Sequence, residues 1–463
     1  MDRFVIKGGT RLEGRIRVNG SKNAALPLLA AALLTDQPVT LRGIPNLADI
    51  ANMLRLLGEL GCPKTGESLG SPQTLTVHSR DESACHARYD IVRTMRAGIC
   101  ALGPLLARRG SARVSMPGGC AIGDRPVDLH LRGLEALGAR ISLDSGDIVA
   151  ATPPGGRLRG ARIFLGGPFG STVLGTANVM SAATLARGTT VIESAACEPE
   201  IVDLAAMLAA MGARISGAGS PRITIHGVEA LTGVDHEVIP DRIEAGTLMC
   251  AAAITDGDVV IENCPLDALM AAVDRLQAMG VSVEELHESR GSSDAHAADP
   301  MRATCRVRRV GAMKPVEITT QPHPGFPTDL QAQFLATLCL SSGNSVVTEK
   351  IFPERFLHVA ELARMGAQVN RAGATVIVSG VHRLVGAPVM ASDLRASAGL
   401  VLAGLAATGT TVINRVYHLD RGYEHLDQRL GTLGARIVRE DDRATEERVP
   451  VIETKPREAV RAV

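Results

Sequence analysis

The chain has 463 residues, 45% of them apolar, and its 49 basic side chains balance its 49 acidic ones. This length exceeds a typical domain of about 100–200 residues. A net charge of zero gives no electrostatic signature for nucleic acid or an anionic membrane. Aromatic residues make up only 2% of the chain, which argues against recognition of bases by stacking.

The beginning of the chain shows no sign of export. Met1 is followed by Asp2, Arg3 and a strand-like stretch rather than by the apolar segment of a signal peptide. The apolar stretch 24–34 is too short to span a bilayer. We therefore expect a soluble, cytoplasmic protein.

The nine cysteines are scattered and include no Cys-x-x-Cys pair. This pattern excludes a disulfide framework and a zinc ribbon. Each cysteine is then either a small buried side chain or a reactive thiol. We expect Cys100, Cys250 and Cys339 to be buried spectators.

One pattern of predicted elements recurs along the whole chain: a helix that ends at a glycine, then a small residue and a strand. Glycine suits such a helix end because it adopts the left-handed backbone conformation without strain. The β-branched residues that follow favour a strand. The pattern occurs six times at intervals of 68 to 86 residues, and its glycines are Gly61, Gly138, Gly212, Gly280, Gly366 and Gly434.

A second Ala- and Leu-rich helix, a turn and a strand precede these copies, as in 182–193, 251–262, 335–349 and 402–414. Each unit then spans about 75 residues. Helices that end in Leu-Gly are common in α/β proteins, but six in register favour a true repeat. Open solenoids usually have repeats of about 20–45 residues, so we expect an α/β protein in which the six units form two groups of three.

Two segments interrupt this rhythm. Residues 284–306 are polar and rich in Ser, Ala and Asp, and we expect a surface-loop insertion there. Residues 439–463 are charge-dense, and we expect 441–463 to be a disordered tail. Neither segment indicates a function.

Function is expected where one copy carries residues that the others lack. The first such place is Gly20-Ser21-Lys22-Asn23, before the helix of 24–34. Ser or Asn before a helix is a good N-cap. A lysine beside free backbone N–H groups would make an anion site, although a solvated lysine at a helix start is the plainer interpretation.

The second place is the glycine-rich stretch around Cys120, which runs from Met116 to His130. Two glycines precede Cys120 and a third follows, unlike the surroundings of a packed core cysteine. Arg125 and the helix start after Pro126 would lower the thiol pKa and attract phosphate. The pattern therefore favours a functional thiol over a buried spectator.

Two further segments carry acidic residues at predicted helix starts. In 240–244 (Pro-Asp-Arg-Ile-Glu), a structural cap or an ion pair between domains is at least as good an interpretation as catalysis. In 324–333, three prolines fix the loop before a helix and Asp329 lies near the helix start. Asp329 is either a helix cap or a positioned general base.

Arginines that follow strands or open helices form the last group. A surface salt bridge is the plain interpretation of any single one, but arginine also matches carboxylate and phosphate with two parallel hydrogen bonds. Six cations occupy related turns, and we expect them to converge while the balancing acids lie elsewhere: Lys22, Arg96, Arg125, Arg355, Arg395 and Arg421. This set indicates a small substrate with two anionic groups.

These segments resemble the UDP-N-acetylglucosamine 1-carboxyvinyltransferases, a branch of the enolpyruvyl transferases. The resemblance covers about 1–440, and its most specific part is the Cys120 motif. The matching segments are Gly-Ser-Lys-Asn-Ala-Ala-Leu-Pro (20–27), Arg-Thr-Met-Arg-Ala (93–97), Leu-Gly-Pro-Leu (102–105), Pro-Gly-Gly-Cys-x-Ile-Gly-x-Arg-Pro-Val-Asp-Leu-His (117–130), Pro-Asp-Arg-Ile-Glu-x-Gly-Thr (240–247), Phe-Pro-Thr-Asp (326–329), Asp-Leu-Arg-Ala-Ser (393–397) and Tyr-His-Leu-Asp-Arg-Gly-Tyr-Glu (417–424).

The resemblance implies a fold of two inside-out α/β barrel domains, each with three βαβαββ units. The implied domains are 22–239, with the Cys120 loop, and 1–21 together with 240–440. The family moves the enolpyruvyl group of phosphoenolpyruvate to the 3′-hydroxyl of UDP-N-acetylglucosamine and releases phosphate, through a tetrahedral ketal. This is the first committed step of peptidoglycan synthesis, and fosfomycin alkylates the family's loop cysteine. No metal, organic cofactor or obligate protein partner is implied.

The resemblance also implies roles for single residues. Cys120 would act as the acid and Asp329 would handle the proton of the sugar hydroxyl. Phosphoenolpyruvate would contact Lys22, Arg125 and Arg421 through its phosphate and Arg355 and Arg395 through its carboxylate. The sugar nucleotide would contact Asn23, Arg96, Arg125, Pro126, Val127, Asp128, Leu129, Ser171, Thr172, Asp329 and Ile351.

The chain departs from the family's pattern in 166–176, which is about three residues longer than usual and lacks a lysine. Gly170, Ser171 and Thr172 would still offer donors to a diphosphate. Two alternatives stay open. One is 3-phosphoshikimate 1-carboxyvinyltransferase, which shares the architecture but lacks the Gly-Gly-Cys loop. The other is a non-catalytic sensor of UDP-sugars.

Overall fold

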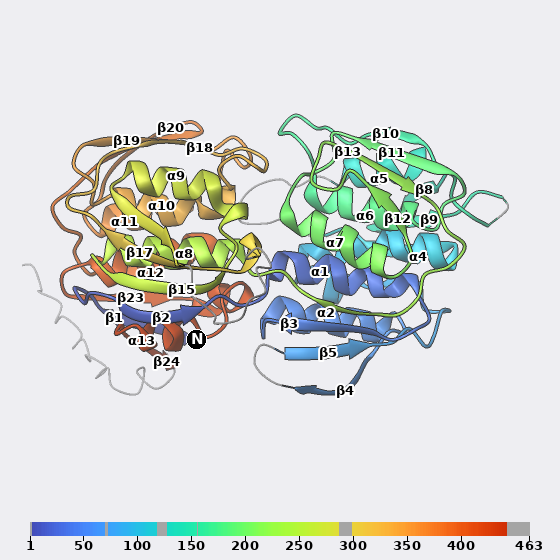
Figure 1. The fold of residues 1–463 in the computed structure, drawn as a ribbon, viewed down its shortest axis with the longest axis horizontal. Helices are drawn as coiled ribbons and strands as arrows, with labels where there is room; N and C mark the ends of the chain where they lie inside the picture. The colour runs from blue at the N-terminus through green and yellow to red at the C-terminus, as the bar shows by residue number, and fades with distance from the viewer. Residues whose placement is uncertain (1, 70–72, 118–126, 155, 287–298, 442–463) are drawn as a thin grey trace, which may run out of the picture.

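The computed structural model describes residues 2–69, 73–117, 127–154, 156–286 and 299–441. Its helices and strands gather in two lobes that lie side by side (Figure 1). One hydrophobic core is built from residues between 24 and 238. The other is built from residues between 4 and 18 and between 243 and 433. We call the parts around these cores the first lobe and the second lobe.

Six four-stranded sheets with one common strand pattern surround the helices. In every sheet an edge strand runs parallel to its neighbour, and the two remaining pairs are antiparallel. A parallel pair needs a crossover connection, which a helix supplies. The α/β class predicted from the sequence is confirmed.

The sheets of the first lobe have the orders β14-β3-β5-β4, β6-β7-β9-β8 and β10-β11-β13-β12. Their strands are β3 (Val39–Ile44), β4 (Lys64–Leu69), β5 (Gln73–Val77), β6 (His86–Ala87), β7 (Ser111–Ser115), β8 (Arg140–Asp144), β9 (Asp147–Ala151), β10 (Arg162–Phe164), β11 (Thr189–Glu193), β12 (Arg214–Ser216), β13 (Arg222–His226) and β14 (Val234–Glu237).

The sheets of the second lobe have the orders β2-β15-β17-β16, β18-β19-β21-β20 and β22-β23-β1-β24. Their strands are β1 (Asp2–Lys7), β2 (Glu13–Arg17), β15 (Asp258–Cys264), β16 (Val281–Glu285), β17 (Ala303–Arg309), β18 (Glu317–Thr319), β19 (Asn344–Thr348), β20 (Gln368–Ala372), β21 (Thr375–Ser379), β22 (Pro388–Met390), β23 (Thr410–Asn414) and β24 (Arg436–Asp441).

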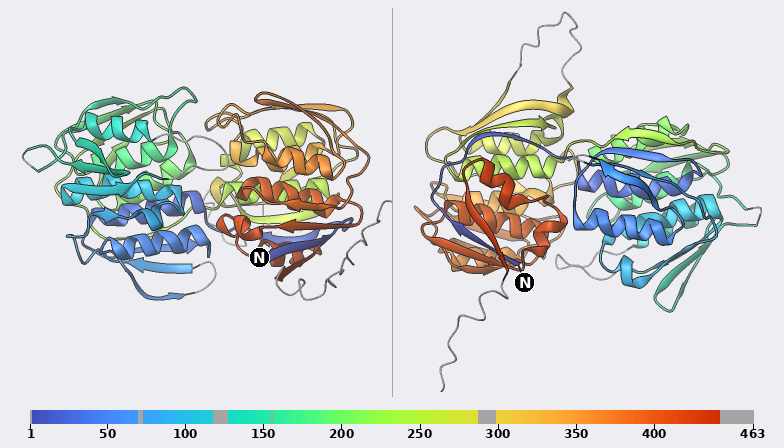
Figure 2. Two further views of the ribbon diagram at one scale, coloured as in Figure 1. Left: turned by 180° about the vertical axis from the view of Figure 1, so that it is seen from behind. Right: turned by 90° about the horizontal axis from the view of Figure 1, so that it is seen from below.

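The helices lie inside the lobes, with the sheets toward the outside (Figures 1 and 2). In the second lobe, α8, α10 and α12 pack on one another and are buried on nearly all sides, which explains why their sequences are apolar without a polar stripe. The α-helices are α1 (Lys22–Ala31), α2 (Ala48–Glu59), α3 (Tyr89–Val92), α4 (Leu102–Arg109), α5 (Asp128–Ala136), α6 (Val173–Ala183), α7 (Pro199–Ala210), α8 (Arg242–Ile254), α9 (Met270–Ala278), α10 (Gln331–Leu338), α11 (Leu357–Arg364), α12 (Leu394–Ala406) and α13 (Leu426–Thr432).

Short 3-10 helices fill several connections. They are η1 (Ala32–Leu34), η2 (Arg96–Ala101), η3 (Asp267–Leu269), η4 (Pro300–Arg302), η5 (Thr328–Leu330) and η6 (Val416–Arg421). None of the helices in the described ranges has the length and apolar character that a bilayer crossing requires.

The predicted helix-ending glycines behave as expected. All six have φ between 74° and 105°, the left-handed region that a residue with a Cβ adopts only at a cost: Gly61, Gly138, Gly212, Gly280, Gly366 and Gly434. A strand follows each of them within three residues. The recurrent sequence pattern therefore marks the same structural event six times.

The two interrupting segments need correction at their edges. Residues 284–285 belong to β16 and 303–306 to β17, which pair in antiparallel fashion. The predicted surface-loop insertion is therefore shorter than 284–306, and its centre, 287–298, lies outside the described residues. Asp441 ends β24 opposite Asp2, so the sheet reaches one residue further than predicted, and the rest of the tail is not described.

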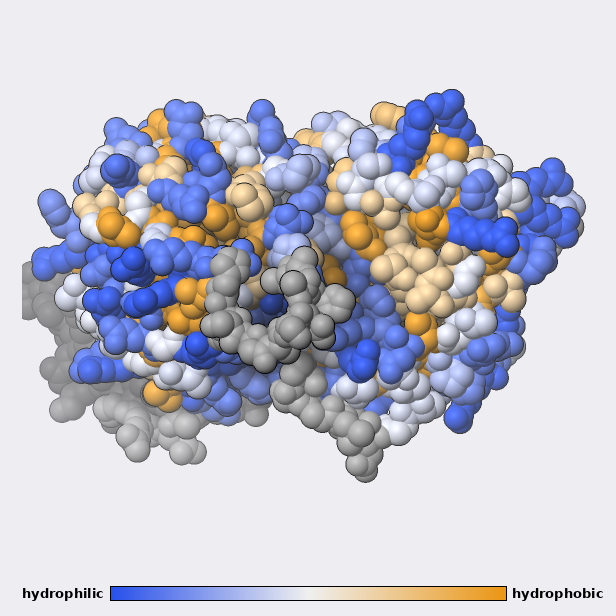
Figure 3. Space-filling model, viewed as in Figure 1, coloured by the Kyte–Doolittle hydropathy of each residue, from blue (hydrophilic) through white to orange (hydrophobic). Residues whose placement is uncertain are grey.

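The chain crosses between the lobes at two adjacent places. Gly20 and Pro240 form an isolated antiparallel bridge. Ser21 donates its N–H to the Ile239 carbonyl at 2.7 Å, and Asp241 donates to Asn19 at 2.8 Å. A Cβ on Gly20 would lie 1.9 Å from the Gly43 carbonyl oxygen, so only glycine fits there. These contacts fix the starts of α1 and α8 beside each other, and hydrophilic residues border the junction (Figure 3).

Candidate functional site between the lobes

Lys22 opens α1 at the junction of the lobes. Ser21 is the N-cap, and its hydroxyl accepts the Ala24 N–H at 3.2 Å, as the sequence predicts. Lys22 is only 6% exposed, so the interpretation as a solvated lysine is wrong. Its backbone N–H donates to Asp241 of the second lobe at 3.2 Å, which ties the helix start to the crossover.

Asp49 joins two of the predicted cations. This carboxylate lies in the first turn of α2 and is 3% exposed. Lys22 Nζ lies 3.3 Å from its Oδ2, and Arg421 Nε lies 2.9 Å from its Oδ1. Arg421 comes from η6 in the second lobe. One buried carboxylate of the first lobe therefore holds one cation from each lobe.

Asp329 gathers a second group of predicted residues. Arg355 Nη1 lies 2.8 Å from its Oδ1, and Arg395 Nη2 lies 3.3 Å from its Oδ2. Asn23 of the first lobe donates its amide to Oδ2 at 3.4 Å. Asp329 lies in η5 and its side chain caps no helix, so the N-cap interpretation is wrong.

The two groups share one electrostatic environment. Burial lowers the pKa of Lys22, and Arg395 and Arg421 act in the same direction while Asp49 and Asp329 oppose them. Burial would raise the pKa of Asp329, but Arg395 and Arg355 outweigh it and hold that pKa well below its ordinary value. Asp329 is therefore a carboxylate ion in this state.

One expectation about charge is corrected here. The acids that balance the converging cations do not lie elsewhere, because Asp49 and Asp329 pair directly with four of the six. Bringing several cations together in a buried site without partners would carry a large desolvation cost. These two carboxylates supply the compensating charge.

Glu349, which no sequence motif indicates, holds the loop that carries Asp329. Its carboxylate is 0% exposed and accepts the hydroxyls of Thr320 at 2.6 Å and Thr328 at 2.9 Å. It also accepts the N–H of Ile351 at 2.8 Å. A glutamate at the end of a β-branched strand, before Lys-Ile-Phe-Pro, was the available signal, but its hydroxyl partners Thr320 and Thr328 lie 29 and 21 residues away and are not visible as a motif.

The acidic residues at the start of α8 have the structural role that the sequence allowed for them, as a helix cap and as part of the contact between the lobes. Asp241 is the N-cap and accepts the N–H groups of Ile243 at 2.8 Å and Glu244 at 3.0 Å. Arg242 makes a buried ion pair at 3.0 Å with Glu200 of the first lobe. This segment therefore fixes the junction of the lobes.

Several predicted residues lie outside these two groups. Cys120, Arg125 and Pro126 fall outside the described residues. Thr172 caps α6 by accepting the Gly175 N–H at 3.2 Å. The N–H of Gly170 donates to the Gly167 carbonyl at 3.1 Å, so this turn has already used that donor. Among the described residues, no hydrogen bond or ion pair joins Asp49 or Asp329 to Val127, Asp128, Leu129, Ser171, Thr172 or Ile351.

The predicted spectator cysteines are confirmed as buried. Cys100, Cys250 and Cys339 are at most 2% exposed, and burial raises the pKa of each thiol, to about 12 for Cys100 and Cys339. A thiol that keeps its proton at neutral pH is a poor nucleophile.

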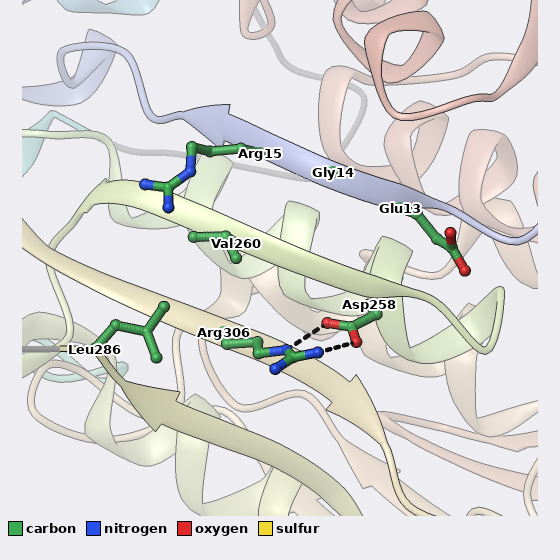
Figure 4. A pocket seen from close by; sticks show the side chains of 7 residues that line it. All are labelled: Glu13, Gly14, Arg15, Asp258, Val260, Leu286 and Arg306. Carbon is green, nitrogen blue, oxygen red and sulfur yellow. Dashed lines mark hydrogen bonds and ion pairs between the residues drawn. The ribbon is translucent and has the colours of Figure 1, made fainter. Parts of the chain in front are cut away.

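Two other features do not belong to this site. The part of the chain that the structure describes holds no group of three or more His, Cys, Asp or Glu residues placed to bind a metal ion. A surface hollow of about 480 Å³ lies on the outer face of the β2-β15-β17 sheet, where Asp258 and Arg306 pair at 2.6 Å (Figure 4). It contains none of the predicted site residues.

The sequence family follows from comparison with known proteins. The family description EPSP synthase (3-phosphoshikimate 1-carboxyvinyltransferase) matches residues 6–430. A UDP-N-acetylglucosamine 1-carboxyvinyltransferase of Gluconacetobacter diazotrophicus is 54% identical over 440 residues, 95% of this chain and 99% of the relative. One of Methylacidiphilum infernorum is 50% identical over 439 residues, again 95% and 99%.

Solved structures of enolpyruvyl transferases share the fold of this chain. The enolpyruvyl transferase NikO from Streptomyces tendae superposes with a TM-score of 0.81 at 26% identity and covers 95% of this chain and 99% of its own. An EPSP synthase from Acinetobacter baumannii shares the fold, with a TM-score of 0.71 at 18% identity over 95% of this chain and all of its own. The chain therefore belongs to the EPSP synthase family of enolpyruvyl transferases, in the branch of the UDP-N-acetylglucosamine 1-carboxyvinyltransferases.

Proposed function

We propose that this protein transfers the enolpyruvyl group of phosphoenolpyruvate to the 3′-hydroxyl of UDP-N-acetylglucosamine and releases phosphate, the first committed step of peptidoglycan synthesis. The observation that carries the proposal is the paired arrangement of Lys22 and Arg421 around Asp49 and of Arg355 and Arg395 around Asp329. Phosphoenolpyruvate has two anionic groups, and each would take over the cations that one carboxylate holds in its absence.

The two pairs of cations suit different groups of phosphoenolpyruvate. Lys22 and Arg421 reach the site from different lobes, and with Arg125 they would bind the phosphate. Arg355 and Arg395 are 5% and 1% exposed, and their guanidinium planes match a carboxylate. Fixed cations in a buried site would also stabilise charge that develops during addition and elimination.

The proton transfers would involve one acid and one base. Cys120 would protonate C3 of phosphoenolpyruvate, so that C2 becomes oxocarbenium-like. The 3′-oxygen then bonds to C2 while Asp329 takes its proton, which gives the tetrahedral ketal. The Cys120 thiolate left by the first step then takes a proton from C3, and cleavage of the bond between C2 and the phosphate oxygen gives the enol ether and phosphate. Cys120 would also be able to add covalently to C2.

Asp329 becomes a better base when substrate arrives. In the described state Arg355 and Arg395 neutralise its charge. If the phosphoenolpyruvate carboxylate engages the two arginines, they are shared between two anions and the pKa of Asp329 rises toward its ordinary range. Asn23, already 3.4 Å from Asp329, would orient the acceptor sugar beside that carboxylate.

The remaining contacts to the sugar nucleotide come from the sequence alone. They would involve Asn23, Arg96, Arg125, Pro126, Val127, Asp128, Leu129, Ser171, Thr172, Asp329 and Ile351. The reaction as written needs no metal and no organic cofactor, and small-molecule substrates in the cytoplasm would be its partners.

The organisation of the chain fits the same proposal. We assign one domain to 22–239 and a second to 1–21 with 240–440. Six sheets of like strand order and two separate cores support two inside-out α/β barrels of three βαβαββ units each. The substrates would bind where the two domains meet, and movement of one domain against the other would enclose them.

The alternatives have weaker support. The matched relatives at 50–54% identity carry the name of the UDP-N-acetylglucosamine enzyme, whereas the EPSP synthase structure at 18% identity supports the fold alone. A non-catalytic sensor would not require Cys120 in its glycine-rich loop or a base held by two buried arginines.

Steady-state phosphate release tests the proposal. We expect phosphate to appear from phosphoenolpyruvate only when UDP-N-acetylglucosamine is present. Release that depends on shikimate 3-phosphate instead would favour the first alternative. Binding of the nucleotide without any turnover would favour the sensor.

The role of Cys120 has its own test. Cys120→Ser should severely reduce turnover, and fosfomycin should alkylate Cys120 selectively among the nine cysteines. The buried thiols at 100, 250 and 339 provide the internal control. Peptide mapping that finds the label on another cysteine would refute this assignment.

A further inference from the structure

Arg395 is the most deeply buried of the described site cations and the least constrained by hydrogen bonds. Its side chain is 1% exposed, and none of its three guanidinium nitrogens makes a hydrogen bond of normal geometry with a described residue, although the Tyr423 hydroxyl lies close enough to help raise the Arg395 pKa. Its ion pair with Asp329, at 3.3 Å, is longer than the 2.8 Å pair of Arg355. The contacts of Arg395 with residues other than Asp329 must therefore help to keep this charge in place.

The aromatic ring of Tyr423 supplies that support. The Arg395 guanidinium carbon lies 5.2 Å from the ring centre, within the range of a cation–π contact. Tyr423 is 2% exposed, so the contact is shielded from water. The backbone before it packs closely, because a Cβ on Gly422 would lie 2.4 Å from Leu394 Cδ1 in the first turn of α12.

A hydrogen-bond network fixes the position of that ring. Thr247 donates its hydroxyl proton to the Ile243 carbonyl at 2.7 Å, so its oxygen accepts the Tyr423 hydroxyl at 2.9 Å. Gln333 Nε2 donates to the Tyr423 oxygen at 3.0 Å. Gln333 thus donates to the tyrosine hydroxyl and Thr247 accepts from it, Arg395 lies beside it, and burial raises its pKa so that it stays neutral.

The same glutamine reaches the proposed base. Gln333 Nε2 also donates to the backbone carbonyl of Asp329 at 3.0 Å. The network therefore joins α8, α10 and the segment after η6, and it relates the position of Asp329 to that of Arg395. Neither Tyr423 nor Gln333 needs to touch substrate for this effect.

We propose that Tyr423, held by Gln333 and Thr247, is a positioning residue that fixes the Arg395 guanidinium for the carboxylate of the donor substrate. The inference rests on the proposed function, which assigns that carboxylate to Arg395. It predicts a selective effect, because Tyr423 contacts Arg395, which is the residue assigned to the carboxylate of phosphoenolpyruvate. Loss of the ring raises the KM for phosphoenolpyruvate and leaves the KM for UDP-N-acetylglucosamine nearly unchanged.

Two variants of Tyr423 and one matched control test the proposal. Tyr423→Leu removes the ring and should raise the KM for phosphoenolpyruvate by about 5- to 30-fold. Tyr423→Phe keeps the ring but loses its two hydrogen bonds, and should raise that KM by about 2- to 5-fold. The control is Phe4→Leu, which removes a buried ring 5.1 Å from Arg439 on the outer sheet and should leave both KM values unchanged.

The outcomes separate this inference from the proposed function. A merely structural role of Tyr423 would lower the melting temperature and the amount of active enzyme, or it would raise both KM values together. Either result, without a separate rise in the KM for phosphoenolpyruvate, overturns the inference. If Tyr423→Leu does not fold, Tyr423→Phe and Gln333→Met carry the test, and unchanged KM values in both overturn it. Absence of turnover in the unmodified protein contradicts the proposed function instead.

Discussion

Asp49 and Asp329 do the same electrostatic task in different ways. Each is a carboxylate with two cations close by. Asp49 pairs with Lys22 of its own lobe and with Arg421 across the junction, so the second of these ion pairs depends on how the lobes sit against each other. Asp329 pairs with two arginines of its own lobe, Arg355 and Arg395, which are held whether or not the lobes move.

This difference suggests that the two groups of cations act differently on the donor substrate. The pairs around Asp329 form a carboxylate site whose two arginines come from one lobe, so binding there would require little rearrangement of one lobe against the other. The pair of Asp49 with Arg421 forms only when the lobes are together, so a phosphate that replaces Asp49 would also bridge them. The donor substrate would then be positioned by one lobe and enclosed by both.

The largest effect should come from removing the charge of Asp329. Asp329→Asn should lower turnover by about 100- to 10,000-fold, because the base for the 3′-hydroxyl is lost. It should also lower the free energy of unfolding at neutral pH by about 3 kcal/mol, since two buried arginines lose their partner. Phosphate release and chemical denaturation measure the two effects.

The pH dependence gives a second check on the same variant. The lowered pKa of Asp329 means that its pairing contributes stability above the unfolded pKa of about 3.9, and this contribution is lost as pH falls toward the folded pKa. The stability gap between the unmodified protein and Asp329→Asn should therefore narrow in acid. A gap that is constant with pH would contradict the ionised pairing.

The lowered pKa of Lys22 predicts a loss of activity in alkaline solution. Lys22 carries its charge below that pKa, so kcat/KM for phosphoenolpyruvate should fall as pH rises through a value below the ordinary lysine value of about 10.4. In Lys22→Arg the charge persists, and the normalised profile should stay level to higher pH even if the rate is lower. Identical alkaline profiles would show that another group controls the fall.

Removing the carboxylate of Asp49 should have a smaller and opposite effect on anion binding. In Asp49→Asn, Lys22 and Arg421 lose their internal anion, so competitive inhibition by inorganic phosphate should strengthen by about 3- to 10-fold. The matched control is Asp235→Asn, which removes an acid that pairs with Arg42 on the surface. It should leave the inhibition by inorganic phosphate unchanged. Weaker phosphate inhibition in Asp49→Asn would mean that Asp49 aligns the cations rather than occupying their site.

The smallest effect should come from the end of the chain. Truncation after Asp441 keeps β24 and its pairing with β1, and turnover should stay within about twofold. Truncation after 440 removes the last paired residue and serves as the comparison. A large loss in the first truncation would assign a role to 442–463.

The sequence predicts the repeated elements well because their signals are local. A glycine with positive φ ends each helix and β-branched residues follow, and both preferences act within a few residues. The predicted convergence of Lys22, Asn23, Asp329 and the arginines on one site was a matter of motif recognition, and most of these side chains do meet.

The sequence could not show which charges pair. Asp49 and Arg421 are 372 residues apart, and Asp49 looks like any acid in a first helical turn. Glu349 and Tyr423 act through partners on other elements, so no spacing rule identifies them. The expectation that the balancing acids lie away from the cations was wrong because the cations are buried. The desolvation cost of a buried charge requires nearby anions.

The most direct test of the account follows the bridging oxygen of phosphoenolpyruvate, the atom between C2 and phosphorus. With this oxygen labelled as ¹⁸O, turnover with UDP-N-acetylglucosamine should place the label in the released phosphate, because the bond between C2 and oxygen breaks. The organic product should be unlabelled and carry the enolpyruvyl group on the 3′-oxygen. Label retained in an organic product would mean attack at phosphorus, and would contradict enolpyruvyl transfer.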